Sequence, residues 1–386
     1  MKSPGSAEWA LLGGNFAIGC GVMVVAGCLN DLVRDLGVSV PVGGQLITAA
    51  AAVMCVGAPL LAALVAGWDR RRLLTLSLLW FGAGHAASAV MPSYASLLPV
   101  RALTVLGAAV FTPQAAAALG VMTPPERRGR AITFVFLGWS LSSVIGMPMH
   151  SYLGETLGWR WAFGLVAVLS LLAAAAVWRA MPDGVRPAPL SLAHWRVILT
   201  HPLLMGIVLV TALSSAGQFT VFSYFAPYYR EVLAASPGQI SLLFLWFGAF
   251  GLIGNMVVSR RIDRLGPARA VGFTLGLMAL SLAAWPLATS MTTMALLLVP
   301  WALGCFSSNS AQQARAGLAH PAYAPALIAL NSSALYFGQA AGAATGGALV
   351  AGAGFGALSP VGLGWMIAAL LLSAWVAHRM QGRHDV

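Results

Sequence analysis

Long apolar segments fill this 386-residue chain almost from end to end, and they restrict its fold more than any other feature. Only 8% of the residues are charged, whereas soluble domains carry about a quarter. A bilayer core of ~30 Å needs about 20 apolar residues per helix. Runs of this kind lie at residues 8–29, 43–66, 73–91, 96–119, 131–153, 161–181, 202–226, 239–258, 269–289, 292–313, 324–350 and 358–379.

These runs predict an all-α integral membrane protein with twelve transmembrane helices. A transmembrane β-barrel would instead show alternating segments of ~10 residues. The first run has no convincing cleavage site, so we expect it to be retained as a span. Four cysteines lie within apolar segments, which indicates buried thiols and neither a disulfide framework nor a metal site: Cys20, Cys28, Cys55 and Cys305.

Two stretches of the chain repeat each other at an offset of 197 residues. In each copy a glycine near the end of one span is followed by an arginine-rich turn. The copies are Gly57 with Arg70, Arg71 and Arg72, and Gly254 with Asp263, Arg264, Gly266 and Arg269. The repeat predicts a duplicated transporter with two pseudo-symmetric six-helix bundles, residues 1–181 and 201–386, joined by a cytoplasmic linker at 182–200.

The basic residues predict the orientation of the chain. With both termini in the cytoplasm, 17 of the 21 Lys and Arg residues fall on the cytoplasmic side, as the positive-inside rule requires. The others are Arg34, Arg101, Arg160 and Arg230. The formal charge of +11 therefore lies in short turns and forms no continuous face, which argues against a nucleic-acid partner.

Four groups of residues carry a resemblance to a known family. The turn from Gly254 to Arg269 matches a loop signature that is degenerate in the first half, where Ala66 and Asp69 replace its aspartate and glycine. A second group is Arg101 with Gly107. The third is Gly138, Gly146, Pro148 and Gly154, followed by Gly158–Phe163. The fourth is Gln218, Phe219, Tyr224, Pro227, Tyr228, Asn331, Ser332, Ser333, Tyr336, Gly338 and Gln339.

Through these motifs the chain resembles the major facilitator superfamily, in its twelve-helix drug:proton antiporter branch, near the bacterial arabinose-efflux and chloramphenicol-exporter group. The resemblance implies a monomeric secondary transporter of the bacterial inner membrane. It would export small drug-like or sugar-like molecules by alternating access, with a proton gradient and no cofactor. An uncoupled facilitator or an uptake carrier is the alternative. An integral-membrane enzyme is disfavoured, because we find no convergent nucleophile, base or metal cluster, and a receptor has little support.

The resemblance also implies roles for the motif residues. The loop signature, Gly254, Asp263, Arg264, Gly266 and Arg269 with Arg70–Arg72, would form a conformational latch, unless it only sets topology. Arg101 would add positive potential to the path or steer protons, unless it snorkels to the outer interface. The glycines at 138, 146 and 154 with Pro148 form the antiporter motif, a hinge or seal if they do more than allow close packing.

The coupling site of the resembled group is absent, because Val22 stands where those proteins carry a glutamate. All ten acidic residues fall in loops or at span ends on these boundaries. Histidine titrates near neutral pH, and His85 and His150 lie within spans. We predict His150 as the proton-site candidate, since span 5 should line the interface between the halves.

Polar and aromatic side chains on several spans are candidates to line the substrate cavity. They are Asn15, Gln45, Gln114, Gln218, Phe222, Tyr224, Asn309, Asn331, Tyr336 and Gln339. An apolar wall with a few amides suits a small uncharged or amphipathic molecule, and the lack of a buried carboxylate disfavours an organic cation. Hydrogen bonds between helices are the other interpretation of these amides.

Overall fold

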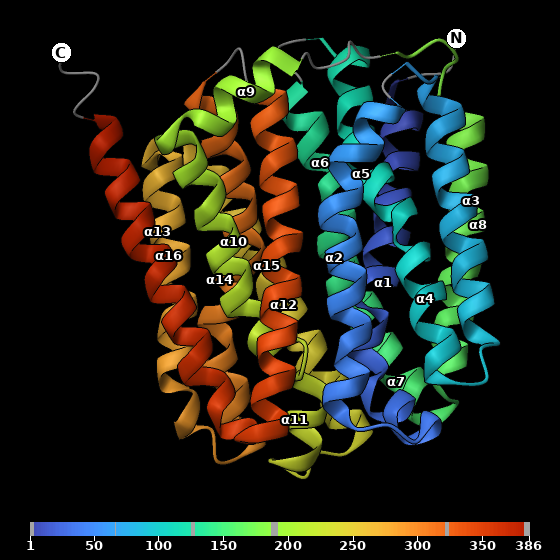
Figure 1. Ribbon diagram of the computed structural model, residues 1–386, viewed down its shortest axis with the longest axis vertical. Helices are drawn as coiled ribbons and strands as arrows, with labels where there is room; N and C mark the ends of the chain where they lie inside the picture. Colours follow the sequence, from blue (N-terminus) through green and yellow to red (C-terminus); the bar gives the residue numbers. More distant parts are fainter. Residues whose placement is uncertain (1–3, 66, 125–127, 187–191, 321–323, 382–386) are drawn as a thin grey trace. The chain divides into compact units, whose positions relative to one another are not determined.

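The computed structural model describes residues 4–65, 67–124, 128–186, 192–320 and 324–381, and no strand occurs in these ranges (Figure 1). The helices of the first half are α1 (Pro4–Leu36), α2 (Val40–Leu64), α3 (Arg70–Ala89), α4 (Tyr94–Thr104), α5 (Leu106–Met122), α6 (Arg128–Leu141), η2 (Ser142–Gly146), α7 (Met147–Thr156) and α8 (Trp159–Ala180). Those that follow are α9 (Leu192–Thr200), α10 (Pro202–Phe222), α11 (Phe225–Glu231), α12 (Pro237–Leu265), α13 (Pro267–Ala284), η3 (Trp285–Leu287), α14 (Met291–Ala319), α15 (Ala324–Gly352), η5 (Phe355–Ala357) and α16 (Leu358–Gln381).

These helices confirm the predicted all-α membrane fold with twelve spans. Nine helical segments in the described ranges are long and apolar enough on their own to cross a membrane. Three predicted spans consist of consecutive helices: α4 with α5, α6 with η2 and α7, and α10 with α11. Sequence analysis did not predict α9 within the linker, where Ile198 is fully buried among apolar residues of α10, α14, α15 and α16.

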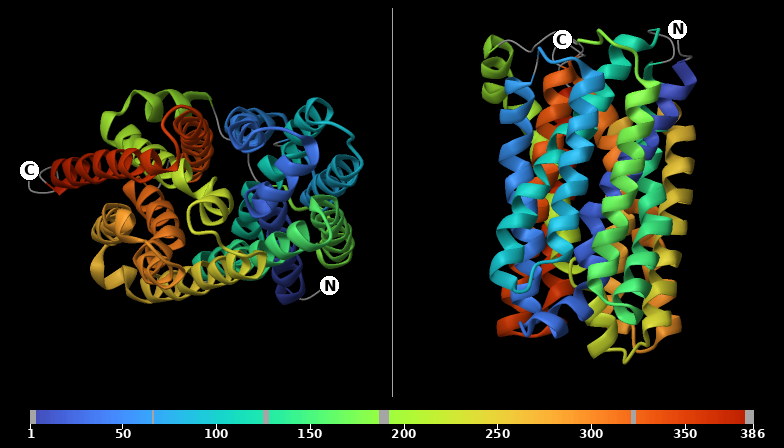
Figure 2. Two further views of the ribbon diagram at one scale, coloured as in Figure 1. Left: turned by 90° about the horizontal axis from the view of Figure 1, so that it is seen from below. Right: turned by 90° about the vertical axis from the view of Figure 1, so that its right-hand side faces the viewer.

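The chain forms two compact units, Met1–Pro189 with Ile240–Leu245, and Leu190–Gln239 with Trp246–Val386. Within each unit the long helices run side by side (Figure 2). In the first, α1 packs against α8 and against α6, η2 and α7, while α3 packs against α5 and α8. In the second, α10 packs against α15 and α16, while α13 packs against α14 and α16. The two halves therefore repeat one packing pattern, as pseudo-symmetry requires. The linker boundaries at 182 and 200 stay a prediction.

Glycines bring the central helix of each unit into backbone contact with its neighbour. A Cβ atom added at Gly338 would lie 2.2 Å from the Ala212 carbonyl oxygen on α10, and one at Gly342 would lie 2.4 Å from that of Ala216. In the first unit, a Cβ atom at Gly138 would lie 2.5 Å from the Leu12 carbonyl oxygen on α1. Because hydrocarbon supplies no hydrophobic force between helices, such close contacts supply much of the attraction.

Replacing Gly338 by alanine is expected to destabilise the second unit by about 1–3 kcal/mol, since the new methyl group meets backbone that cannot move aside. Thermal unfolding in detergent should show a lower melting temperature. Gly352→Ala on the same helix is the matched control, because its added methyl group would meet nothing within 4 Å. Equal melting temperatures for the two variants would contradict this account of the α10–α15 contact.

Candidate functional site

Arg101 is buried inside the first unit, with 1% of its surface exposed. It extends from the last turn of α4 to α1, where Nη2 donates to the carbonyl oxygens of Gly21 at 2.8 Å and Val22 at 3.3 Å. Its Nη1 lies 3.0 Å from His85 Nε2. Snorkelling to the outer interface is therefore wrong for Arg101. No carboxylate among the described residues lies within ion-pair distance of it.

The contacts of Arg101 assign the tautomer of His85. Because a guanidinium only donates, His85 Nε2 must accept, and the ring proton then lies on Nδ1. That nitrogen is 2.8 Å from the Phe81 carbonyl oxygen, to which it donates. His85 is thus a neutral imidazole with both nitrogens in use, and a second proton would place two positive groups in contact. The Arg101 guanidinium also contacts the backbone of Val22, the position at which the resembled group carries a glutamate.

His150 has a different environment. It is fully buried on α7 and faces α1, where a Cβ atom at Gly27 would lie 3.0 Å from its own Cβ. Neither ring nitrogen makes a well-formed hydrogen bond within the described part of the chain, although the backbone of Cys20 on α1 lies close enough to interact with the ring. His150 follows the π-helical turn η2, in which Met147 N donates to Ser142 O, five residues back. Pro148 has no N–H to donate, and such turns occur often at functional sites.

The antiporter-motif glycines contact α1 along its length. Gly146 approaches the Cys20 side chain, and a Cβ atom at Gly154 would lie 2.5 Å from Cys28 Cβ. The backbone of α1 leaves helical geometry at Cys28, with φ −108° and ψ 22°. The motif therefore packs span 5 onto span 1 within one unit, which agrees with the close-packing interpretation. A hinge or seal role stays a proposal.

Two of the predicted cavity amides join helices within their own units. Asn15 Nδ2 donates to the Val135 carbonyl oxygen at 3.2 Å, and its Oδ1 accepts from Thr112 Oγ1 at 2.8 Å. In the second unit, Thr211 donates to Asn331 Oδ1 and accepts from Gln312 Nε2 at 3.0 Å. The first set joins spans 1, 4 and 5, and the second joins spans 7, 10 and 11. Sequence analysis missed Thr112, Thr211 and Gln312, although each is a polar residue within an apolar run.

The other cavity candidates differ in exposure. Gln114 and Gln339 are buried, and Gln218 and Asn309 are partly exposed, whereas Gln45 is exposed and accepts from Tyr94 Oη at 3.1 Å. Tyr336 is buried too. Tyr224 donates to the Ala343 carbonyl oxygen at 2.8 Å, joining α15. Phe222 belongs to an aromatic cluster that sequence analysis did not identify, made by Phe222, Phe225, Phe247, Trp285 and Trp301.

The predicted latch residues of the first half are mostly held within their own unit. Arg70 is buried and donates to the Val65 and Trp68 carbonyl oxygens. Arg71 pairs with Asp183 at 2.7 Å, while the Arg72 guanidinium is exposed. Asp69, which replaces the signature glycine, caps α3 and accepts from Gly184 N at 2.6 Å.

In the second half, the Asp263 side chain lies outside the described residues, so its latch role stays a proposal. Arg264 and Arg269 are exposed. Gly254 touches α14, since an added Cβ atom would lie 2.1 Å from Leu303 O. Gly266 has φ +78°, a conformation that favours glycine. Arg315, predicted in a cytoplasmic turn, lies within α14 with 5% of its surface exposed and donates to Ser373 Oγ at 2.9 Å.

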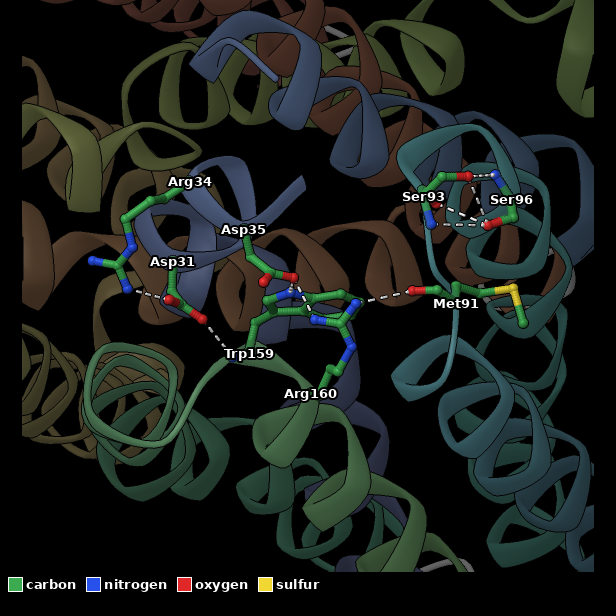
Figure 3. Close-up of polar contacts among 8 residues, drawn as sticks. All are labelled: Asp31, Arg34, Asp35, Met91, Ser93, Ser96, Trp159 and Arg160. Atoms are coloured by element: carbon green, nitrogen blue, oxygen red, sulfur yellow. Dashed lines mark hydrogen bonds and ion pairs between the residues drawn. The ribbon is translucent and has the colours of Figure 1, made fainter. Parts of the chain in front are cut away.

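The far end of α1 carries two carboxylates that bind the start of α8 (Figure 3). Asp31 pairs with Arg34 and accepts from the backbone N–H of Trp159 at 2.6 Å, at the helix N-terminus where a negative charge is stabilised. Asp35 accepts from Trp159 Nε1 at 2.9 Å and pairs with Arg160. Arg160 also donates to the Met91 carbonyl oxygen. These contacts tie α1, α8 and the turn that follows α3 together, and Arg101 takes no part in them.

A double-mutant cycle should reveal the Arg101–His85 contact as a coupling of about 1.5–3 kcal/mol, the range for hydrogen bonds to charged groups. The variants are Arg101→Gln, His85→Phe and their combination, with unfolding free energies measured in micelles. Each single change removes the same contact, so their effects should not add. Strict additivity would show that the two side chains do not interact.

Comparison with known proteins agrees with this architecture. The sequence model of the Major Facilitator Superfamily matches residues 11–234 and 207–383. The chain is 31% identical over 375 residues to the inner membrane transport protein YdhP of Escherichia coli K12, covering 96% of each chain. It is 35% identical over 274 residues to a chloramphenicol resistance protein of Streptomyces lividans, covering 70% of this chain and 69% of that one.

Among solved structures, the human organic anion transporter MFSD10 superimposes with a TM-score of 0.77 at 16% identity, over 96% of this chain and all of that one. At this identity the likeness shows the fold alone. The family consists of transporters rather than enzymes, and the relatives named here are transport or resistance proteins. The chain belongs to the Major Facilitator Superfamily.

Proposed function

We propose that this transporter exports small drug-like or sugar-like molecules by alternating access, in exchange for protons. The observation that carries the proposal is the glycine series at 138, 146 and 154, which resembles the motif that marks exporters and packs span 5 onto α1. Similarity to a chloramphenicol resistance protein over 70% of the chain also supports export. The wider resemblance to the arabinose-efflux group supports sugars as the second class.

The interior chemistry of the two units favours an uncharged or amphipathic substrate. Neutral amides and aromatic rings occupy much of the second unit, which also buries Arg315. Among the described residues of the first unit, the buried charged side chains are Asp31, Arg70 and Arg101. Asp31 already binds Arg34 and the Trp159 N–H. A cation would need a carboxylate near its path, and the acidic residues of the described helices lie near helix ends. We therefore expect little transport of organic cations.

His150 is the proposed proton carrier. Both nitrogens of His85 are already in use, and protonation there would oppose Arg101. His150 lacks well-formed hydrogen bonds and follows the π-helical turn at Ser142–Gly146, so the ring can accept a proton if that segment opens. Cytoplasmic termini, the bacterial inner membrane and a monomeric state complete the proposal.

Proteoliposomes with an internal pH-sensitive dye test the exchange. Under an imposed proton gradient, chloramphenicol or a pentose should move against the protons and give a substrate-dependent dye signal. An organic cation of similar size should give none. Substrate movement without a dye signal would reject antiport and make the chain an uncoupled facilitator.

His150→Asn should abolish substrate-dependent proton flux while substrate binding persists, because asparagine fits the site but does not titrate near neutral pH. His378→Asn is the matched control, since that histidine is exposed at the end of α16. Tryptophan fluorescence reports substrate binding, and the internal dye reports proton flux in the same proteoliposomes. Unchanged coupled flux in His150→Asn would exclude this residue as the proton carrier.

A further inference from the structure

An open groove of about 530 Å³ lies between α3 and α8, two helices that pack side by side in the first unit (Figure 1). Its lining is aliphatic except at one end, and consists of Arg72, Thr75, Leu76, Leu79, Leu171, Ala174, Ala175 and Trp178. Several of these apolar side chains are about half exposed, including Leu76 at 53% and Leu171 at 50%. In a membrane protein such a surface faces lipid.

The lining residues follow helical spacing on both helices, so the groove runs along the helix axes. Arg72 and Trp178 lie at one end, and Leu79 and Leu171 lie at the other. Seven residues of α-helix rise about 10 Å, while one leaflet of the hydrocarbon core is roughly 15 Å thick. The groove therefore covers about two-thirds of the depth of a leaflet. It is long enough to hold most of one acyl chain.

The charged end of the groove is preformed by neighbouring contacts. The Arg71 guanidinium lies 4.2 Å from the centre of the Trp178 ring, and Arg71 Nε donates to the Trp178 carbonyl oxygen at 2.7 Å. Asp183 neutralises Arg71 through a pair of hydrogen bonds at 2.7 and 2.8 Å. Arg71 thus holds the Trp178 ring in place, and its own charge is already paired with Asp183.

Arg72 has the opposite properties. It lines the groove, it is exposed, and none of the described residues forms an ion pair with it. Its backbone N–H donates to Asp69 Oδ1 at 3.2 Å, a bond that caps the first turn of α3. An uncompensated guanidinium at the polar end of an acyl-sized groove matches the phosphate of a phospholipid.

We propose that the α3–α8 groove is a binding site for one anionic glycerophospholipid. Its phosphate would pair with Arg72, and one acyl chain would lie along Leu76, Leu79 and Leu171. Trp178 would lie at the headgroup level, where membrane tryptophans concentrate. The site is formed by the first unit alone. It shares Arg72 with the predicted conformational latch, but it uses neither the proton-site candidate nor the substrate-cavity candidates.

Native mass spectrometry of the detergent-purified protein tests the site, with phosphatidylglycerol and phosphatidylcholine of the same acyl chains added in competition. One arginine near the membrane surface contributes about 1 kcal/mol toward anionic lipid, so Arg72→Gln should lower the phosphatidylglycerol preference of the first bound lipid about five-fold. Arg72→Lys should retain most of it. Arg260→Gln, which removes an exposed arginine outside the groove, should leave the preference unchanged.

A second pair of variants tests the acyl-chain part of the groove. Ala175→Trp should fill it and reduce binding of both lipids, whereas Ala176→Trp, an exposed alanine on the same helix that does not line the groove, should not. An unchanged lipid preference in Arg72→Gln, or equal lipid binding by the two tryptophan variants, would overturn the proposal. Equal binding of the two lipids by the unaltered protein would overturn it as well.

Discussion

Close backbone contact between one central helix and its neighbour is the interaction on which each half of this transporter depends. Lipid tails are as apolar as the helices, so burial of leucine supplies little attraction, and association rests on van der Waals contact and a few polar bonds. Gly338, Gly342 and Gly346 allow that contact between α15 and α10, and Gly138 allows it between α6 and α1. Substituents at these positions would collide with backbone, so the glycines set how near the other side chains come.

Polar bonds then fix the register that the glycines permit. Asn15 and Thr112 join three helices of the first unit, and Thr211, Gln312 and Asn331 join the corresponding three of the second. The residue types differ although the helices correspond, so each unit joins its three helices with its own polar groups. Arg101 adds a charge in the first unit that backbone carbonyls and His85 stabilise together.

The fold could be predicted because hydropathy and glycine motifs can be recognised in short stretches of sequence. The partners of polar residues could not be predicted, because they lie far apart in the chain. The predicted first span ends at residue 29, yet α1 continues to Leu36 because Asp31 and Asp35 meet Trp159 and Arg160, far along the chain. Sequence analysis placed Pro148 in the antiporter motif, but it did not predict the π-helical turn before that residue. Asn15 and Asn331 fitted a cavity and an interhelical bond equally well, until the structure supplied their partners.

The carboxylates at the end of α1 also impose an order in time on assembly of the first half. Asp31 precedes the N–H that it binds at Trp159 by 128 residues. At about 5–20 residues per second, the first helix waits on the order of ten seconds before its partner leaves the ribosome. During that interval its end retains two carboxylates without their final donors, and the arrival of α8 completes the half. The contacts between α1 and α8 at this end of the first bundle can therefore form only after the sixth span has been synthesised.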